Sequence, residues 1–195
     1  MYEAFKKTLC HRQTMRRHVQ NHIRPFSGCR VLDIGCGIGD ILSYLPDSIG
    51  AYSGFDMNQN YIDLAKLRWV NRKNCDFFCQ KVDEMTISEK GSYDIVIATG
   101  ILHHLSDQEA LKLFDLASQA LKPGGELVTY DNVYVEGQHW FARWLNSKDR
   151  GKTVRTIEGY KNLAFQVFSE IKGSLLHDTL RFPYTIFVMT CSKMS

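Results

Sequence analysis

A short apolar stretch that runs directly into three closely spaced glycines most constrains what this chain can fold into. Residues 31–34 have the composition of a buried strand, and Gly35, Gly37 and Gly39 follow at alternate positions. Glycine tolerates a tight turn and lets the backbone at a helix N-terminus approach a ligand closely. The stretch therefore predicts a strand, a turn and a helix that together bind a nucleotide-like group.

The length and composition of the chain indicate one domain. With 195 residues and 44% hydrophobic content, we expect a single domain over residues 1–195. The sequence holds no apolar run long enough to cross a bilayer, and residues 1–24 are too polar for a secretory signal, which predicts a cytoplasmic protein. The six cysteines show neither a CxxC pair nor a zinc-type histidine spacing, so we expect reduced structural thiols and no metal.

The N-terminal stretch is strongly basic. Six Lys or Arg residues stand against one acid, Glu3, within residues 1–24, whereas the net charge of the whole chain is only +3 and does not indicate nucleic-acid binding. Apolar residues at helical spacing predict a basic helical lid over residues 1–27, which Pro25 ends. Its charges are either solvated or form a surface for an anionic substrate or membrane headgroups, and both readings stay open.

Strand-like and helix-like patterns alternate through the middle of the chain. The expected strands are 30–34, 51–56, 76–80, 93–99 and 125–131, and the expected helices are 38–46, 59–71 and 107–121. Ser106 and Glu109 have the spacing of a capping box at the start of the last helix. This alternation favours a doubly wound α/β fold with a mostly parallel sheet.

The C-terminal part of the chain changes the pattern. A helix over 157–171 is followed by two strands, 174–181 and 184–191, with only a short turn at Pro183 between them. Strands joined so closely must pair antiparallel, because a parallel crossover needs about a dozen residues. The predicted architecture is a mostly parallel seven-stranded sheet that ends in an antiparallel C-terminal hairpin strand.

The carboxyl ends of the predicted strands hold the residues suited to a ligand, as expected for an open parallel sheet. Asp56 ends the second strand 17 residues beyond Gly39, where a carboxylate can accept hydrogen bonds from both ribose hydroxyls. A nicotinamide fingerprint, G-x-G-x-x-G, would need glycine at position 40, where the chain has Asp40. This difference speaks against a pyrophosphate lying on the turn.

The G-x-G-x-G spacing after Val31-Leu-Asp-Ile34 resembles motif I of the class I S-adenosylmethionine-dependent methyltransferases. Three further segments are similar to that family, namely Tyr52-Ser-Gly-Phe-Asp56, the Tyr93–Thr99 strand with Leu102-His-His-Leu105, and Leu121-Lys-Pro-Gly-Gly-Glu-Leu-Val128. The likeness covers residues 30–131, and the terminal hairpin matches the family's reversed seventh strand. It implies the Rossmann-like methyltransferase fold, S-adenosyl-L-methionine as cofactor, and the small-molecule subgroup of the family.

The resemblance implies which residues hold the methionine end of the cofactor. The backbone of Gly35-Cys36-Gly37 would approach the methionine portion, and Asp33 would help to hold its amino group, directly or through water. The backbone of Thr99 would lie near the same amino-acid moiety.

The adenosine end is implied in the same way, with one departure. Asp56 would bind the ribose diol, and Met57 would pack against the adenine. The family often has Gly-Asp where this chain has Gln80-Lys81, and Lys81 cannot accept a hydrogen bond from the adenine amino group. We expect Val82 and Asp83 to substitute.

Two histidines and one carboxylate are the catalytic candidates. If the acceptor is a hydroxyl, a general base assists methyl transfer, and histidine suits this role at neutral pH. His103 and His104 follow the fourth strand, and Asp131 ends the fifth. The alternatives are that the histidines pack or orient the cofactor and that Asp131 caps a loop. Catechol-type members bind magnesium beside such an Asp-Asn pair, but the fourth strand here ends without an acid, so no metal is expected.

Residues 133–156 form an insertion on the expected substrate side. An apolar, helix-like stretch over 139–145 precedes a basic loop over 148–155. This composition suits an acceptor with a ring or apolar portion and an anionic group. The substrate-side candidates are Trp140, Trp144, Arg150, Arg155 and Tyr160. The alternative is that the tryptophans pack the lid and the charges are solvated.

Two functions from different classes remain at this stage. The leading hypothesis is an S-adenosylmethionine-dependent methyltransferase that methylates a small molecule or an anionic metabolic intermediate, with oxygen as the expected acceptor atom. The other is a catalytically idle S-adenosylmethionine-binding protein whose basic helix contacts RNA, a membrane or a protein partner. No motif identifies the acceptor or the oligomeric state.

Overall fold

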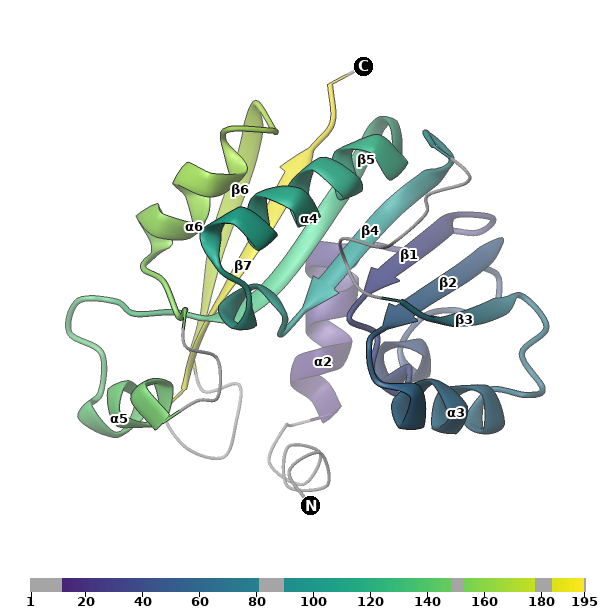
Figure 1. Cartoon of the computed structure of the whole chain (residues 1–195), viewed down its shortest axis with the longest axis horizontal. Helices are drawn as coiled ribbons and strands as arrows, with labels where there is room; N and C mark the ends of the chain where they lie inside the picture. Colours follow the sequence, from purple (N-terminus) through teal and green to yellow (C-terminus); the bar gives the residue numbers. More distant parts are fainter. Residues whose placement is uncertain (1–11, 81–89, 149–152, 178–183, 195) are drawn as a thin grey trace.

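The computed structural model describes residues 12–80, 90–148, 153–177 and 184–194, which form one seven-stranded sheet with helices on both faces (Figure 1). The strands are β1 (Arg30–Ile34), β2 (Ala51–Asp56), β3 (Cys75–Cys79), β4 (Tyr93–Thr99), β5 (Leu121–Asn132), β6 (Glu170–His177) and β7 (Thr185–Ser192). They are ordered β3-β2-β1-β4-β5-β7-β6, and β7 runs antiparallel to both of its neighbours whereas all other pairs are parallel. The predicted fold class, including the C-terminal hairpin, is confirmed.

The helical segments divide between the two faces of the sheet. They are α2 (Arg12–His18), η1 (Val19–Ile23), η2 (Asp40–Ser43), α3 (Gln59–Arg68), η3 (Leu102–His104), α4 (Asp107–Ala120), α5 (Trp140–Lys148) and α6 (Ile157–Ala164). Helices α4 and α6 lie over one face and share one core with it, whereas η1, η2 and α3 pack on the other face in a second core (Figure 1). Within β1, Leu32 and Ile34 join the first core and Val31 joins the second, as the alternation of a doubly covered strand requires.

The predicted helix over 38–46 is wrong. The structure has only the short 3-10 turn η2, and the following carbonyl groups are satisfied from outside the segment. The Arg72 guanidinium donates to the carbonyl oxygens of Leu42, Leu45 and Pro46, at distances of 2.7, 3.2 and 2.7 Å. Because Arg72 supplies these hydrogen bonds, the segment needs no helix, and Pro46 could not have donated to one.

The predicted helix over 157–171 is too long. Helix α6 ends at Ala164, and β6 begins at Glu170 and pairs with β7 along its whole length. Ile171, which continues the apolar helical stripe in the sequence, instead lies opposite Cys191 in the sheet. Pairing with β7 therefore overrides the helical pattern at the end of this segment.

The predicted start of α4 is seen in the structure. Ser106 accepts a hydrogen bond from the Glu109 amide while the Glu109 carboxylate accepts one from the Ser106 amide, so the capping box of α4 is confirmed. The described part of the N-terminal segment packs Val19 and Ile23 against the sheet. Among the residues that the structure describes, no helix combines the length and apolar character needed to span a membrane.

Candidate functional site

The glycine turn after β1 has a backbone that only glycine adopts readily. Gly35, Gly37 and Gly39 have φ angles of +76°, +55° and +71°. A Cβ atom added at Gly37 would meet no atom within 4 Å, so the space over this residue is open. A Cβ atom at Gly39 would instead lie 2.8 Å from Trp69 Nε1. The turn is therefore open to a ligand at Gly37, whereas at Gly39 it packs against Trp69.

The amides of this turn are engaged within the protein. The amides of Gly35 and Cys36 donate to the Phe55 carbonyl oxygen at 2.7 and 3.0 Å, and the Gly39 amide donates to the Cys36 carbonyl oxygen at 2.9 Å. These donors are therefore not arranged to bind a phosphate, which agrees with the absence of a dinucleotide fingerprint. The Cys36 side chain packs inward against Gly54, so only its backbone belongs to the ligand surface.

Asp56 connects the glycine turn to the end of β2 by hydrogen bonds. Its Oδ2 accepts a hydrogen bond from the Gly37 amide at 2.9 Å, and its Oδ1 accepts one from the Asn58 amide at 2.8 Å. A carboxylate has about four acceptor positions, so two bonds to backbone leave capacity for a ligand's hydroxyl groups. Asp56 thus lies where a ribose could be held, as predicted, beside the open surface of Gly37.

Asp33 is buried below the turn. It is 3% exposed, and Tyr52 Oη donates to its Oδ2 at 2.6 Å. Burial, aided by the negative charge of Asp56, raises the pKa of Asp33 to about 7, against the opposite effect of the Tyr52 hydrogen bond. Two carboxylates that repel each other make this region favourable for a positively charged ligand. Sequence reasoning missed Tyr52, whose position on β2 beside Asp33 becomes evident only once the β1–β2 pairing is known.

Exposed apolar side chains lie just after β2 and near the end of β3. Met57 is 62% exposed and Phe78 is 42% exposed, and the Phe78 ring stacks on Phe55 with the ring centroids 4.8 Å apart. Such a surface suits a flat ring. Val82 and Asp83, which were expected to bind the adenine amino group, lie outside the described residues.

A buried histidine–carboxylate pair stands at the ends of β4 and β5. His103 Nδ1 and Asp131 Oδ1 are 2.7 Å apart, and the His103 amide donates to the same oxygen at 3.2 Å. The two side chains are 4% and 2% exposed. His104 is exposed, with its ring 4.1 Å from that of His103. Of the two histidines, His103 is the one that the carboxylate orients.

Two buried oxygen atoms near this pair lack hydrogen-bond partners within the described part of the chain. They are Oδ2 of Asp131 and Oγ1 of Thr99. Leaving a buried polar atom unpaired is costly, and this cost is removed when a ligand supplies the partner. The ends of β4 and β5 are therefore prepared for polar groups of a bound molecule.

Comparison with known proteins places these features in a family. A profile described as "Methyltransferase domain" matches residues 31–125. A ubiquinone biosynthesis O-methyltransferase from Idiomarina loihiensis is 26% identical over 110 residues, which cover 56% of this chain and 44% of that protein. A phosphoethanolamine N-methyltransferase from Plasmodium falciparum is 28% identical over 138 residues, covering 69% of this chain and 51% of that protein.

A solved structure shows the same fold. It is Haemonchus contortus phosphoethanolamine N-methyltransferase 2 in complex with phosphomonomethylethanolamine and S-adenosylhomocysteine, with a TM-score of 0.78 at 18% identity over 95% of this chain and 54% of that one. Over residues 31–125 this chain is a methyltransferase domain of the class I S-adenosylmethionine-dependent family. It spans about half the length of the two relatives named above.

The site at the ends of β1, β2 and β4 fits the family's cofactor. S-adenosylmethionine carries a positively charged amino group and a sulfonium, which suit a region that contains Asp33 and Asp56. Its ribose would lie at Asp56, its adenine over Met57, and its amino-acid portion along the Gly35–Gly37 backbone near Thr99. The open space over Gly37 and the unpaired Thr99 Oγ1 are the structural observations that support this fit.

The insertion after β5 contains the predicted substrate-side tryptophans. Trp140 and Trp144 lie on α5 and are 72% and 50% exposed, so neither packs the inside of a lid. Arg150 lies outside the described residues. The exposed faces of the tryptophans remain available to another molecule.

Two predicted substrate-binding residues are corrected by the structure. Tyr160 is 1% exposed, and its hydroxyl donates to the Asn132 carbonyl oxygen at 3.0 Å, so it belongs to the core. The Arg155 guanidinium donates to the carbonyl oxygens of Leu102 and Leu105 at 2.9 and 2.7 Å and forms an ion pair with Asp107. Arg155 therefore fixes the turn that carries His103, and its donors are already committed.

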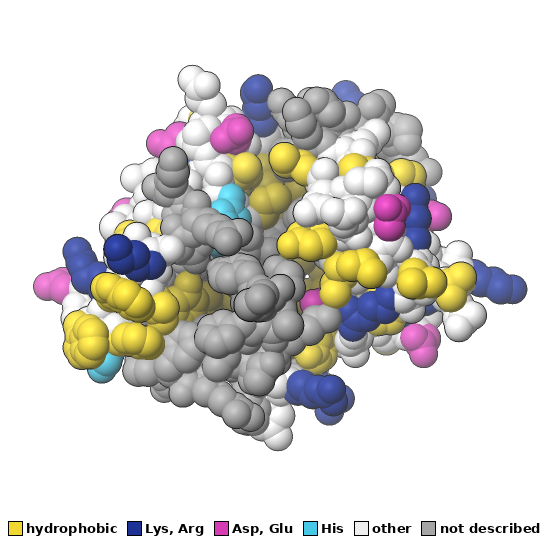
Figure 2. Space-filling model, turned by 60° about the horizontal axis from the view of Figure 1, so that its bottom comes forward, with side chains coloured by type: hydrophobic (Ala, Val, Ile, Leu, Met, Phe, Trp, Pro, Cys, Tyr) yellow, Lys and Arg dark blue, Asp and Glu magenta, His cyan; other side chains and the backbone are white. Residues whose placement is uncertain are grey.

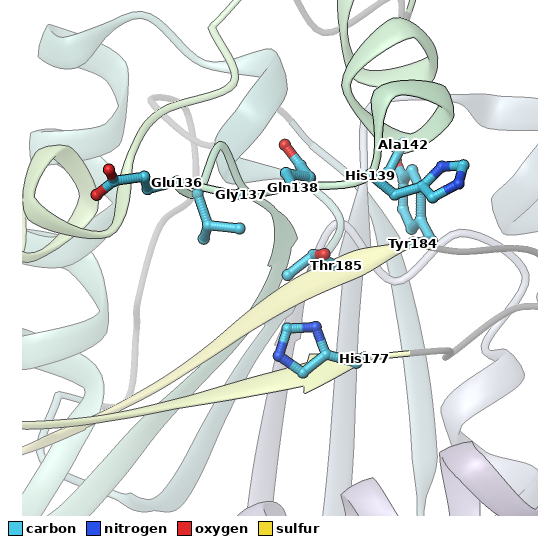
Figure 3. A pocket seen from close by; sticks show the side chains of 9 residues that line it. Glu136, Gly137, Gln138, His139, Ala142, His177, Tyr184 and Thr185 are labelled. Atoms are coloured by element: carbon cyan, nitrogen blue, oxygen red, sulfur yellow. The ribbon is translucent and has the colours of Figure 1, made fainter.

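A cavity of about 270 Å³ lies farther along the same edge of the sheet (Figure 3). The segment after β5 lies over the ends of β6 and β7, and the lining includes Gln138, His139, Ala142, His177, Tyr184 and Thr185. Sequence reasoning missed this pocket. The available signal was that an antiparallel β7 brings its own start and the end of β6 to the edge where β5 ends.

Proposed function

We propose that this chain is an S-adenosylmethionine-dependent methyltransferase that methylates a small molecule, most favourably at a hydroxyl oxygen, with His103 as general base. The observation that carries this proposal is the buried His103–Asp131 pair, which stands at the sheet edge shared with the glycine turn. Two independent elements, the cofactor surface at β1–β2 and a proton acceptor at β4–β5, thus lie at neighbouring strand ends.

The roles of the residues follow from the hydrogen bonds. The bond from Nδ1 to Asp131 makes Nε2 the basic nitrogen of the neutral His103 ring, and Asp131 stabilises the ring once it is protonated. Nε2 would remove the acceptor's proton as the new bond forms. When bound, S-adenosylmethionine supplies an electrophilic methyl group. The burial of His103 and Asp131 keeps bulk water from competing for this proton.

The relatives support a small acceptor without deciding its reacting atom. One is named for ubiquinone biosynthesis and O-methylation, and the other for N-methylation of phosphoethanolamine. An ammonium acceptor must also lose a proton before it accepts a methyl group, so the same histidine would serve either chemistry. The oxygen assignment in our proposal rests on the match between a neutral imidazole base and a hydroxyl group.

The test is release of S-adenosylhomocysteine with a panel of phenols, phosphorylated amino alcohols and carboxylates. His103→Ala should reduce turnover by about 10²–10⁴-fold, the usual contribution of a positioned base, with S-adenosylmethionine affinity unchanged. Asp131→Asn should also slow turnover, and His104→Ala should cost less than about tenfold because the Asp131 carboxylate is bonded to the ring of His103.

Two results would contradict the proposal. If His103→Ala retains full turnover, His103 is not the base. If the chain binds S-adenosylmethionine but no acceptor yields product, the alternative of a catalytically idle cofactor-binding protein gains support.

A further inference from the structure

Helix α5 has one face fixed to the sheet edge and another that carries exposed aromatic rings. On the inner face, Ala142 and Asn146 are 1% and 2% exposed. Asn146 Nδ2 donates to the Val133 carbonyl oxygen at 2.9 Å, and its Oδ1 accepts from Asn132 Nδ2 at 3.3 Å. These contacts hold the helix in a defined orientation, so what its other face presents is a fixed surface.

The outer face is unusually apolar for a surface helix. Trp140 and Trp144 lie one turn apart and are 72% and 50% exposed. The Phe141 ring lies between them in the sequence and stacks with Trp144, with the centroids 5.8 Å apart and an interplanar angle of 21°. Indole rings combine a large apolar area with one N–H donor, a combination that favours the boundary between water and lipid.

The charged residues of α5 itself are all basic. Arg143 and Lys148 are exposed on α5, and the helix contains no acidic residue. Figure 2 shows hydrophobic and basic side chains gathered together on one side of the face at which the strands β1, β4 and β5 end. A cationic, aromatic surface is complementary to an anionic phospholipid bilayer.

We propose that the outer face of α5 docks the protein on anionic phospholipid membranes, with Trp140 and Trp144 inserted at the headgroup level and Arg143 and Lys148 beside the phosphates. This goes beyond the proposed methyl transfer and does not depend on it. Helix α3 offers a contrast in the kind of apolar side chain, because its exposed Leu64 and Leu67 are aliphatic, and its exposed charges include Asp63 as well as Lys66 and Arg68.

The test measures binding to vesicles of phosphatidylcholine alone and with about one third phosphatidylglycerol, by co-sedimentation and by tryptophan emission. We expect binding to the anionic vesicles, weakened by salt, with an emission shift to shorter wavelength. The double substitution Arg143→Gln and Lys148→Gln should weaken binding by about thirtyfold, since each basic residue near such a surface contributes roughly fivefold. Trp140→Ala with Trp144→Ala should weaken it at least about tenfold.

The control is Leu64→Ala with Leu67→Ala, which removes two exposed aliphatic side chains from a surface helix and should leave vesicle binding unchanged. Both tryptophans are at least half exposed, so their replacement should preserve the fold, as a melting curve would verify. Absence of binding at low salt, or equal binding by the tryptophan variant, would overturn the proposal. Concentration-dependent self-association that the tryptophan variant abolishes, without vesicle binding, would instead assign this face to contact between copies.

Discussion

Replacing Asp33 by asparagine tests how the cofactor surface is charged. Asp33 has a pKa raised to about 7 from the ordinary value of 3.8, because it is buried and because Asp56 is negatively charged nearby. Below about pH 4 both the folded and unfolded states hold this proton. Between pH 4 and pH 7 the folded state keeps it while the unfolded state loses it. The contribution of Asp33 to the free energy of unfolding therefore falls as pH rises through this window.

The size of this loss in the free energy of unfolding follows from the pKa shift of Asp33. About three pKa units at about 1.4 kcal/mol each give a loss on the order of 4 kcal/mol by pH 7, after which the contribution is constant. Asparagine does not titrate, and its Oδ1 can still accept the Tyr52 hydroxyl. Asp33→Asn should thus be more stable than the wild type above pH 7 by up to about 4 kcal/mol, and the difference should shrink steadily toward about pH 4.

The assay is urea unfolding of both proteins across this pH range. Groups distant from Asp33 contribute equally in both proteins, so their contributions cancel in the difference. A positively charged cofactor favours the ionised carboxylate, so wild-type affinity for S-adenosylmethionine should also rise with pH, and Asp33→Asn should lose this dependence. A stability difference that stays constant with pH would show that Asp33 titrates normally and would refute the reasoning.

Three further predictions concern stability and the positioning of the site. Gly54→Ala should destabilise the fold by about 1–3 kcal/mol, because its Cβ would lie 2.9 Å from both Cys36 Sγ and Tyr52 Cε1. The added change Cys36→Ala removes only the first of these contacts and should restore part of the loss in thermal unfolding; no rescue would contradict the Cys36 contact. Ser106→Ala should cost about 1 kcal/mol through loss of the α4 cap, whereas an unchanged melting temperature would discount the cap. Arg155→Gln should lower the free energy of unfolding by about 2 kcal/mol or more, and it should reduce kcat because Arg155 holds the turn that carries His103. A rise in KM with kcat unchanged would instead indicate that Arg155 binds the substrate.

Local sequence signals were sufficient for much of the fold. The strands, the glycine turn and the capping box at Ser106 each depend on a few adjacent residues, so pattern alone identified them. The antiparallel hairpin could be predicted because the connection at Pro183 has too few residues for a parallel crossover. The position of Asp56 beside Gly37 followed once two parallel strands were placed side by side.

Features that depend on distant partners were not predictable in this way. The 38–46 segment lost its helix because Arg72, some 30 residues away, bonds its carbonyl groups. Arg155 and Tyr160 are residue types suited to binding a substrate. In the folded protein, however, Tyr160 is buried and the donors of Arg155 are bonded to backbone carbonyl oxygens. The pocket beside α5 joins the end of β6, the start of β7 and the segment after β5, and no single stretch of sequence encodes it.

The central claim is that the glycine turn and Asp56 form an S-adenosylmethionine site, and calorimetric titration of the purified chain with this cofactor tests it most directly. We predict one site per chain with a dissociation constant on the order of micromolar, retained in the control Asp63→Ala and weakened at least about a hundredfold in Asp56→Ala. Absence of binding by the wild type, or equal affinity in Asp56→Ala, would contradict the account.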